Sequence, residues 1–496
     1  MARLGLEREI VDGGVLASTI AWFREAKITL PTFGELASPG RTPPQVRDAL
    51  AGIDPDAAHP LNLFRVNWYN AANRRDLVDV PEHFMVPEGL TGVRAKIVVA
   101  LGRSFPMIEA HKVLAAYACL APRVVTGQFD PTTHRALWPS TGNYCRGGVA
   151  ISRIMRCRGV AILPAEMSRE RFEWLERWVV DPSDIVKTPG SESNVKEIYD
   201  KCAELGRDPH NVIFNQFCEF GNHLAHYAVT GRALAHVFES MKAHDPELRL
   251  SGFVSATGSA GTIGAGDYLK DAYGTRIVAV EALECPTLLY NGFGAHNIQG
   301  IGDKHIPFIH NVMNTDAAAA VSDAATDSLA VLFSHPAGRE YLKSRRGLSD
   351  EEIGGLASLG FSGICNVLAA IKTARYYDLG TKDVVVTVAT DGAAMYGSEC
   401  RKILAARFGG QLDAICAAEV FGQHMAATTA DHFAELSHVD RKRIFNLGYF
   451  TWVEQQGISV LEFNARRDQS FWRKQRDMLP VWDEMIADFN RQVLAR

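Results

Sequence analysis

The chain has 496 residues, of which 47% are hydrophobic, 22% charged and 9% aromatic. This length corresponds to about two or three folding units, and the average composition excludes the disordered, collagen-like and disulfide-stapled classes. The 52 basic and 57 acidic residues give a formal net charge of -5 without a long basic run, so we expect no nucleic-acid partner.

The N-terminal sequence and the cysteines indicate a cytoplasmic protein. The segment MARLGLEREIVDGGVLASTIAWF carries charges throughout and lacks the apolar core of a signal peptide. No uninterrupted apolar stretch reaches about 18 residues, so we expect no membrane-spanning helix and no membrane partner. The nine cysteines include no C-x-x-C pair, which is typical of reduced thiols and gives no support for a zinc site.

The first region in chain order, residues 1–90, is expected to be an N-terminal extension rather than a separate domain. It contains the Pro-rich PTFGELASPGRTPP and the aromatic-rich NLFRVNWYNAANRR, which indicate a partly irregular structure.

The second region, residues 91–400, alternates short β-branched runs with longer helical patterns. Helical patterns such as HKVLAAYACL and ICNVLAAIKTARYY separate the runs. This alternation predicts parallel β-α-β units, and hence an α/β fold. The runs expected to be strands buried on both faces are IVVAL (97–101), GVAIL (159–163), NVIFN (211–215), GFVSAT (252–257), IVAVEA (277–282) and DVVVTVAT (383–390).

The last region, residues 401–496, is expected to be a helical C-terminal extension. Its segment FWRKQRDMLPVWDEMIADFNRQVL has the apolar spacing of an amphipathic helix. We expect this face to pack on the main body or on an oligomer interface.

The 42 glycines gather in a few short segments, and the most informative one follows the run 252–257. A strand, a turn of small residues and a helix start form an anion cradle, because backbone N–H groups converge and the helix dipole favours negative charge. A single phosphate fits such a turn, and a tight structural turn is the alternative. The residues of the turn are Gly258, Ser259, Ala260, Gly261 and Thr262.

A dinucleotide site is the competing interpretation of this turn. Glu281 lies 20 residues after Gly261, where an acid that binds a ribose would stand. The spacing does not fit, because the G-x-G-x-x-G pattern requires a glycine where the chain has Ala260. A Walker-type site is excluded as well, since no G-K-[ST] closes the loop.

A second loop places small polar residues directly before a helix, in WPSTGNYCRGGVAISRIMRCRG. Ser140, Thr141, Gly142 and Asn143 bring hydroxyls, an amide and helix-start N–H groups together, which suits a carboxylate or a phenolate-type oxygen. Helix capping alone would also explain Ser140 or Thr141.

Several further motifs occur in a fixed order around these loops. They are VRAKIVVALGRSFPMIEAHKVLAAY, AILPAEMSRERFEWL, VIFNQFCEFGNHLAHYAVTG, AVEALECPTL, the QGIG turn, FSGICNVLAAIKTAR and VTVATDGAAMYGS. Together with the loops, the motifs resemble the fold-type II pyridoxal 5'-phosphate enzymes of the cysteine synthase and cystathionine beta-synthase family, in the tryptophan synthase beta-like superfamily. The resemblance implies two parallel-sheet α/β subdomains with the cofactor between them, across the catalytic residues 91–400.

The resemblance also implies the site residues. Lys112 would hold pyridoxal 5'-phosphate as a Schiff base, with Lys96 as the local rival, and would later act as the base. Asn143 would bind the ring oxygen of the cofactor, and residues 258–262 would cradle its phosphate. The substrate would be bound by Ser140, Thr141, Tyr144 and Gln216.

The implied activity is β-elimination or β-replacement on a β-substituted amino acid of the serine, O-acetylserine or cysteine type, through an aminoacrylate. An amino-acid dehydratase, ammonia-lyase or racemase is the alternative within the fold, and a non-catalytic ligand-binding relative is the second class. The family also implies a homodimer.

Three departures from the family pattern bear on specificity. Tyr144 and Cys145 replace small residues of the substrate loop, and IEAHK before the cofactor lysine lacks the usual Gly-Ser. Near the pyridine nitrogen, either Thr390 or Asp391 replaces a serine. A threonine leaves the nitrogen uncharged, whereas an aspartate keeps it protonated.

The histidines and Cys145 have simpler interpretations than a metal site or a nucleophile. The histidines lack a carboxylate or cysteine that completes a ligand set, so no metal is expected. Cys145 is expected to be a buried, inert thiol. The histidines considered are His223, His226, His296, His305 and His310.

Overall fold

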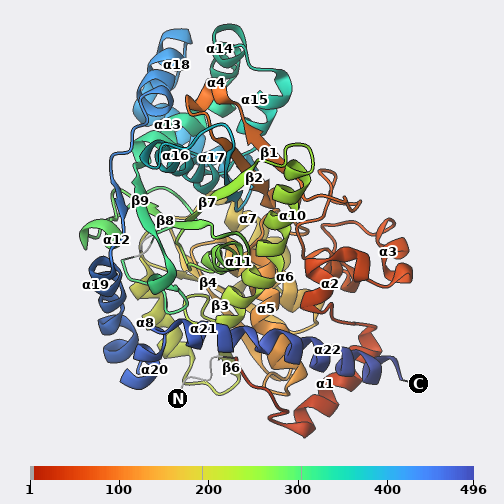
Figure 1. Cartoon of the computed structure of the whole chain (residues 1–496). Coiled ribbons are helices and arrows are strands. Elements are labelled where there is room, and N and C mark those ends of the chain that lie inside the picture. The colour runs from red at the N-terminus through yellow and green to blue at the C-terminus, as the bar shows by residue number, and fades with distance from the viewer. Residues whose placement is uncertain (1–4, 193, 303, 496) are drawn as a thin grey trace.

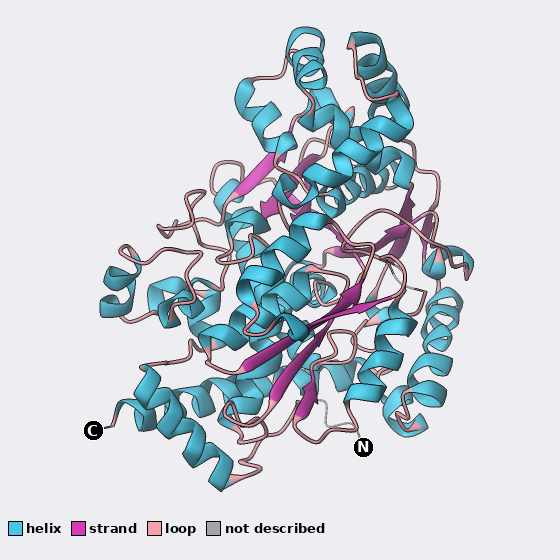
Figure 2. Ribbon diagram, turned by 180° about the vertical axis from the view of Figure 1, so that it is seen from behind, coloured by secondary structure: helices cyan, strands magenta, loops and turns pink. Residues whose placement is uncertain are grey.

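The computed structural model describes residues 5–192, 194–302 and 304–495. The chain forms an α/β fold with two sheets, and helices cover both (Figures 1 and 2). The large sheet has the order β1-β2-β10-β7-β8-β9-β11, and the small sheet has the order β5-β4-β3-β6. The predicted α/β class with parallel strands is therefore confirmed.

The inner strands of the large sheet are parallel, and its two edge strands are antiparallel to their neighbours. Every residue of β10 is buried, as expected for a strand covered on both faces. The helices α11 (Ile263–Tyr273) and α16 (Phe361–Tyr376) pack on this sheet. Its strands are β1 (His83–Val86), β2 (Lys96–Leu101), β7 (Arg249–Ala256), β8 (Arg276–Ala282), β9 (Ala317–Val321), β10 (Asp383–Ala389) and β11 (Phe433–Glu435).

The small sheet is parallel throughout. The helices α6 (Asn143–Ile154) and α8 (Val195–Leu205) pack on it, and α5 (Lys112–Val125) packs on α6. Its strands are β3 (Arg135–Pro139), β4 (Arg158–Pro164), β5 (Ile185–Thr188) and β6 (Asn211–Ile213).

All six predicted strands are present, and the described residues contain five others that the sequence patterns did not predict. The expected burial on both faces was wrong for β6, which is half-buried because it lies at the edge of the small sheet. One of the five unpredicted strands, β9, has the sequence AAAAV, which carries no β-branched run and favours a helix by intrinsic propensity. It is nevertheless a buried strand, because it pairs with β8 on one side and with β11 on the other. Tertiary pairing overrides local preference here.

The two ends of the chain pack on each other. In Figure 1, α1 (Gly13–Ala26) lies beside α22 (Met478–Leu494). The rings of Phe23 and Phe489 meet edge to face at 5.3 Å, and the Asp483 carboxylate accepts hydrogen bonds from the backbone N–H of Phe33 and Gly34. The expected extensions also supply the edge strands β1 and β11, so both take part in the main body.

None of the helices in the described ranges combines the length and apolar composition needed to span a membrane. The remaining α-helices are α2 (Phe33–Ala37), α3 (Pro44–Leu50), α4 (Glu88–Thr91), α7 (Arg169–Trp178), α9 (Phe220–Ala225), α10 (Gly231–Lys242), α12 (Thr287–Tyr290), α13 (Asp323–Ser334), α14 (Pro336–Arg346), α15 (Asp350–Ala357), α17 (Gly397–Phe408), α18 (Ala414–Phe421), α19 (His438–Tyr449), α20 (Val460–Ala465) and α21 (Gln469–Arg476).

Candidate active site

One cavity brings together the loops that the sequence analysis singled out. Its walls come from residues just after the carboxyl ends of β3 and β6 in the small sheet and of β7 and β10 in the large sheet. Crevices at the carboxyl ends of parallel strands are the usual ligand sites of α/β folds. The lining residues are Lys112, Ser140, Thr141, Asn143, Tyr144, Glu192, Gln216, Phe217, Gly258, Ser259, Gly300, Ile301 and Thr390.

Lys112 is the first residue of α5 and is half-buried at the cavity. Its Nζ donates hydrogen bonds to Gln216 Oε1 and to Ser259 Oγ, both at 3.0 Å. Lys96, the local rival, is the first residue of β2 and does not line this cavity. The amine thus lies between the loop after β6 and the glycine loop after β7.

The glycine loop has the geometry of an anion cradle. Ala260 adopts a left-handed φ of 60°, which turns the backbone before α11 begins at Ile263. A Cβ on Gly261 would lie 2.2 Å from Asn222 Oδ1, so any other residue there would have to displace the Asn222 side chain. Within the described residues, the backbone N–H groups of 258, 259, 260 and 262 have no hydrogen-bond acceptor. These open donors suit a phosphate.

Glu281, the acid of the dinucleotide alternative, is engaged elsewhere. Its carboxylate accepts hydrogen bonds from the backbone N–H of Leu288 at 2.7 Å and of Leu289 at 2.9 Å. Burial raises the pKa of Glu281 to about 7. Because both oxygens are occupied at the start of α12, this side chain has a structural role.

The loop after β3 holds its hydroxyls in internal hydrogen bonds. Ser140 Oγ accepts from Gly142 N at 3.1 Å and from Gln216 Nε2 at 3.3 Å. Thr141 Oγ1 donates to the Glu192 carboxylate. Ser140 keeps its own O–H for a carboxylate, whereas the hydroxyl proton of Thr141, expected to bind substrate, is already used in this structure.

Thr390 and Asp391, the two candidates for the contact with the pyridine nitrogen, lie at different positions relative to the cavity. Thr390 lines the cavity, whereas Asp391 is only 1% exposed and does not line it. Asp391 Oδ2 accepts hydrogen bonds from Asn143 Nδ2 and from the Tyr396 hydroxyl, both at 2.6 Å. Asp391 thus fixes the amide of Asn143 from behind the cavity wall.

Two buried arginines complete this network. Arg171 donates to Tyr396 OH at 3.1 Å, and Arg146 donates to Asn143 Oδ1 at 3.1 Å. Burial raises the pKa of Asp391, and the hydrogen bonds from Tyr396 and Asn143 and the charges of both arginines oppose that rise. Burial also lowers the pKa of Arg146 to about 10.

The sequence analysis missed Glu192, Arg146 and Tyr396, and gave Arg171 no role although it lies in the segment AILPAEMSRERFEWL. Glu192 stands just beyond β5, and a carboxylate at the carboxyl end of a parallel strand is a signal that could have found it. Arg146 and Tyr396 carried no such signal, because Arg146 donates to Ile108 O and Tyr396 contacts Arg171, and both contacts join segments that are separated in the chain.

Tyr144 and Cys145 are both fully buried. The Tyr144 ring packs edge to face on Trp138 at 5.4 Å, and Tyr144 lines the cavity. Cys145 Sγ donates to Gly142 O at 2.9 Å, and burial raises the pKa of its thiol to about 12. This environment is that of an inert thiol.

The histidines take part in separate local contacts. His223 Nε2 lies 3.5 Å from Asp267 Oδ2, and His310 Nε2 lies 3.1 Å from Thr315 Oγ1. Across the described part of the chain, no group of three His, Cys, Asp or Glu side chains could hold a metal ion.

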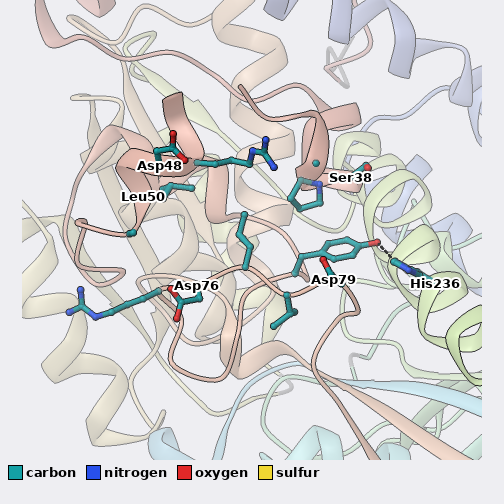
Figure 3. A pocket seen from close by; sticks show the side chains of 14 residues that line it. Ser38, Asp48, Leu50, Asp76, Asp79 and His236 are labelled. Atoms are coloured by element: carbon teal, nitrogen blue, oxygen red, sulfur yellow. Dashed lines mark hydrogen bonds between the residues drawn. The ribbon is translucent and has the colours of Figure 1, made fainter. Parts of the chain in front are cut away.

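A larger, more open cavity lies between the N-terminal extension and α10 (Figure 3). The Tyr69 hydroxyl and His236 Nδ1 meet in its wall at 3.1 Å, and charged side chains such as Asp48 and Asp76 surround it. No predicted site residue lines this cavity. The cavity at Lys112 is therefore the candidate active site.

Comparison with known proteins supports the sequence resemblance over part of the chain. No family model matches the chain. Over 185 residues, 36% of the chain, it is 32% identical to cysteine synthase B of Campylobacter jejuni. Over 153 residues it is 29% identical to cystathionine beta-synthase of Saccharomyces cerevisiae. These matches span 58% and 28% of the lengths of the two relatives.

Solved structures share the fold over most of the chain. A hydrogen sulfide-producing enzyme of Fusobacterium nucleatum aligns with 67% of the chain, at 20% identity and a TM-score of 0.54. The alignment includes 98% of that enzyme's structure. An O-acetylserine-dependent cystathionine beta-synthase of Helicobacter pylori covers 64% of the chain and 94% of its own length, at 21% identity and a TM-score of 0.52. The expected fold-type II architecture is confirmed.

Proposed function

We propose that the protein is a pyridoxal 5'-phosphate-dependent enzyme that acts on a β-substituted amino acid of the serine, O-acetylserine or cysteine type, by β-elimination or β-replacement. The observation that carries the proposal is the position of Lys112, whose Nζ lies 3.0 Å from Ser259 Oγ in the glycine loop. A lysine amine and a phosphate cradle on one cavity are what this cofactor requires. The named relatives support the same class of reaction.

The residues present fit the cofactor. The open N–H groups of residues 258, 259, 260 and 262 would hold its phosphate, and Lys112 would bind it covalently. Asn143, oriented by Asp391 and Arg146, would face the ring oxygen, and Thr390 would face the pyridine nitrogen. When bound, the cofactor supplies an electron sink for the bonds at the α-carbon of an amino acid.

The chain's own groups would carry binding and proton transfer. Ser140 Oγ–H and the Gln216 amide would bind the substrate carboxylate. The Lys112 amine would take the α-proton, since it stands at the cavity within hydrogen-bond distance of Gln216. Thr390 would offer a neutral hydroxyl to the pyridine nitrogen, which would leave that nitrogen uncharged.

The direct test combines a spectrum with a substrate panel. Purified protein with added pyridoxal 5'-phosphate should be yellow, and Lys112→Ala should lose all turnover. Keto-acid release from serine, O-acetylserine and cysteine reports elimination, and product formation with added sulfide reports replacement. A colourless protein that takes up no cofactor would contradict the proposal, and D-amino acid formation without elimination would instead indicate a racemase.

We also propose that the protein is a homodimer, because the family resemblance implies it, and that it is cytoplasmic, because the cysteine pattern is typical of reduced thiols. All nine cysteines are free in the structure. Light scattering on the purified protein should give twice the mass of one chain, and a monomer mass would contradict the dimer.

A further inference from the structure

Glu192 is a buried carboxylate in the wall of the active-site cavity. It is 2% exposed and lines the cavity with Lys112. Its Oε1 accepts hydrogen bonds from Thr141 Oγ1 and, at 2.8 Å, from the backbone N–H of Gly300. These bonds hold the carboxylate between the loop after β3 and the turn at 300.

The second carboxylate oxygen, Oε2, has no hydrogen-bond partner among the residues that the structure describes. Arg171 supplies compensating charge, but its Nη1 is 3.8 Å from Oε2, too far for a hydrogen bond. The Arg171 N–H groups go instead to Thr141 O at 3.2 Å and to Tyr396 OH at 3.1 Å. Oε2 therefore has an ion-pair contact with Arg171 but accepts no hydrogen bond from the described residues.

Thr141 adds to the same chemistry. Its single hydroxyl proton is donated to Glu192, so its oxygen offers only lone pairs to the cavity. Glu192 Oε2 and Thr141 Oγ1 are thus two acceptors at one wall. An anionic group would bring further lone pairs to this wall, whereas a hydroxyl or ammonium group would bring the missing protons.

The carboxylate of Glu281, which has a structural role, differs from that of Glu192 in its hydrogen bonds. Glu281 is equally buried, and both of its oxygens accept backbone N–H groups. Asp391 also has an unpaired oxygen, Oδ1, but Asp391 does not line the cavity, whereas Glu192 does. Buried polar atoms in proteins are nearly always paired, so an unpaired oxygen on a residue that lines a cavity indicates a ligand.

We propose that Glu192 and Thr141 form a subsite for the proton-donating end of a small co-substrate, and that this subsite selects hydroxyl- or ammonium-bearing molecules over anionic ones. That this co-substrate is the group added at the β-carbon of the amino acid rests on the proposed function. Its binding does not.

The test uses three small thiols of matched length that differ at the far end: cysteamine with an ammonium, 2-mercaptoethanol with a hydroxyl, and 3-mercaptopropionate with a carboxylate. Each is titrated by calorimetry into holoenzyme reduced with borohydride, in which the cofactor is fixed and no turnover occurs. In the wild type, the first two should bind at least about tenfold more tightly than the third.

Glu192→Gln should lower that preference by at least about tenfold, because the amide can turn an N–H toward the ligand where the carboxylate offered a lone pair. Glu192→Ala is the second variant if the first does not fold. Glu176→Gln is the matched control, since Glu176 is exposed on α7, and it should keep the wild-type preference.

Failure of the inference and failure of the proposed function give different results. A wild type that binds all three thiols equally, or none of them, overturns the subsite, and so does a preference that survives in Glu192→Gln. If the protein takes up no cofactor, titration of the cofactor-free protein should still show tighter binding of cysteamine and 2-mercaptoethanol than of 3-mercaptopropionate. The subsite would then stand while the proposed function fails.

Discussion

The two sides of the candidate active site are built in different ways. The large-sheet side offers the backbone N–H groups of the small residues 258, 259, 260 and 262. The small-sheet side offers side chains, among them Ser140, Thr141 and Glu192, tied together by hydrogen bonds. A phosphate can be held by backbone alone, whereas a substrate is distinguished by side-chain chemistry. This difference agrees with the proposed function, in which the large-sheet side would bind the phosphate of the cofactor and the small-sheet side would select the substrate.

The largest expected effect comes from the carboxylate that joins the two sides. Asp391 follows β10 of the large sheet and binds Asn143 of the small-sheet side, with Arg146 and Arg171 nearby. Asp391→Asn should lower the free energy of unfolding by about 3 kcal/mol, because two buried guanidinium groups lose a compensating charge. Denaturant unfolding at pH 7 measures this.

Asp378→Asn is the control for that change, since Asp378 is exposed, and it should shift the free energy of unfolding by less than about 0.5 kcal/mol. Equal stability of wild type and Asp391→Asn would mean that the two sides are not joined through Asp391.

The second prediction concerns the glycine loop on the large-sheet side alone. In Gly261→Ala the new Cβ would lie 2.2 Å from Asn222 Oδ1, and Asn222 also donates to Ser259 Oγ at 3.0 Å. Displacement of Asn222 should weaken cofactor binding about 100-fold, or about 2.7 kcal/mol. Fluorescence titration with pyridoxal 5'-phosphate measures it.

Gly354→Ala is the matched control, because a Cβ there meets nothing within 4 Å. It should bind the cofactor like the wild type. Unchanged affinity in Gly261→Ala would show that the loop after β7 does not hold the phosphate.

A smaller effect compares a structural carboxylate with the one proposed to bind a ligand. The pKa of Glu281 rises from the ordinary 4.5 to about 7 in the folded protein, so the folded state keeps a proton that the unfolded state has lost. Stability is therefore lost as pH rises from about 4.5 to 7. Relative to Glu281→Gln, the wild type should lose about 2 kcal/mol over this window.

Unfolding curves of both proteins at several pH values test this, and a constant difference between them would contradict it. The Glu281→Gln variant should bind the three thiols in the wild-type order, because Glu281 lies outside the active-site cavity.

The sequence predicts the backbone parts of this molecule better than its side-chain networks. The β-branched runs became strands, and the glycine loop and Lys112 meet at one cavity. These features have local signals. The strand β9 has none, because its AAAAV sequence becomes a strand only through its neighbours.

The contacts of Glu192 and Asp391, like the strand β9, have no local signal in the sequence. Glu192 bonds to Thr141 and Gly300, and Asp391 bonds to Asn143, each partner lying far away in the chain. Only the fold brings these groups together. For that reason the choice between Thr390 and Asp391 at the cavity stayed open in the sequence.

If Lys112 holds the cofactor, the covalent bond between them can be located by chemical trapping. The protein with added pyridoxal 5'-phosphate is reduced with borohydride, digested and mapped by mass spectrometry. We expect one reduced pyridoxal phosphate on the peptide that contains Lys112, and none in Lys112→Ala. An unmodified Lys112 peptide, or the label on Lys96, would contradict this expectation.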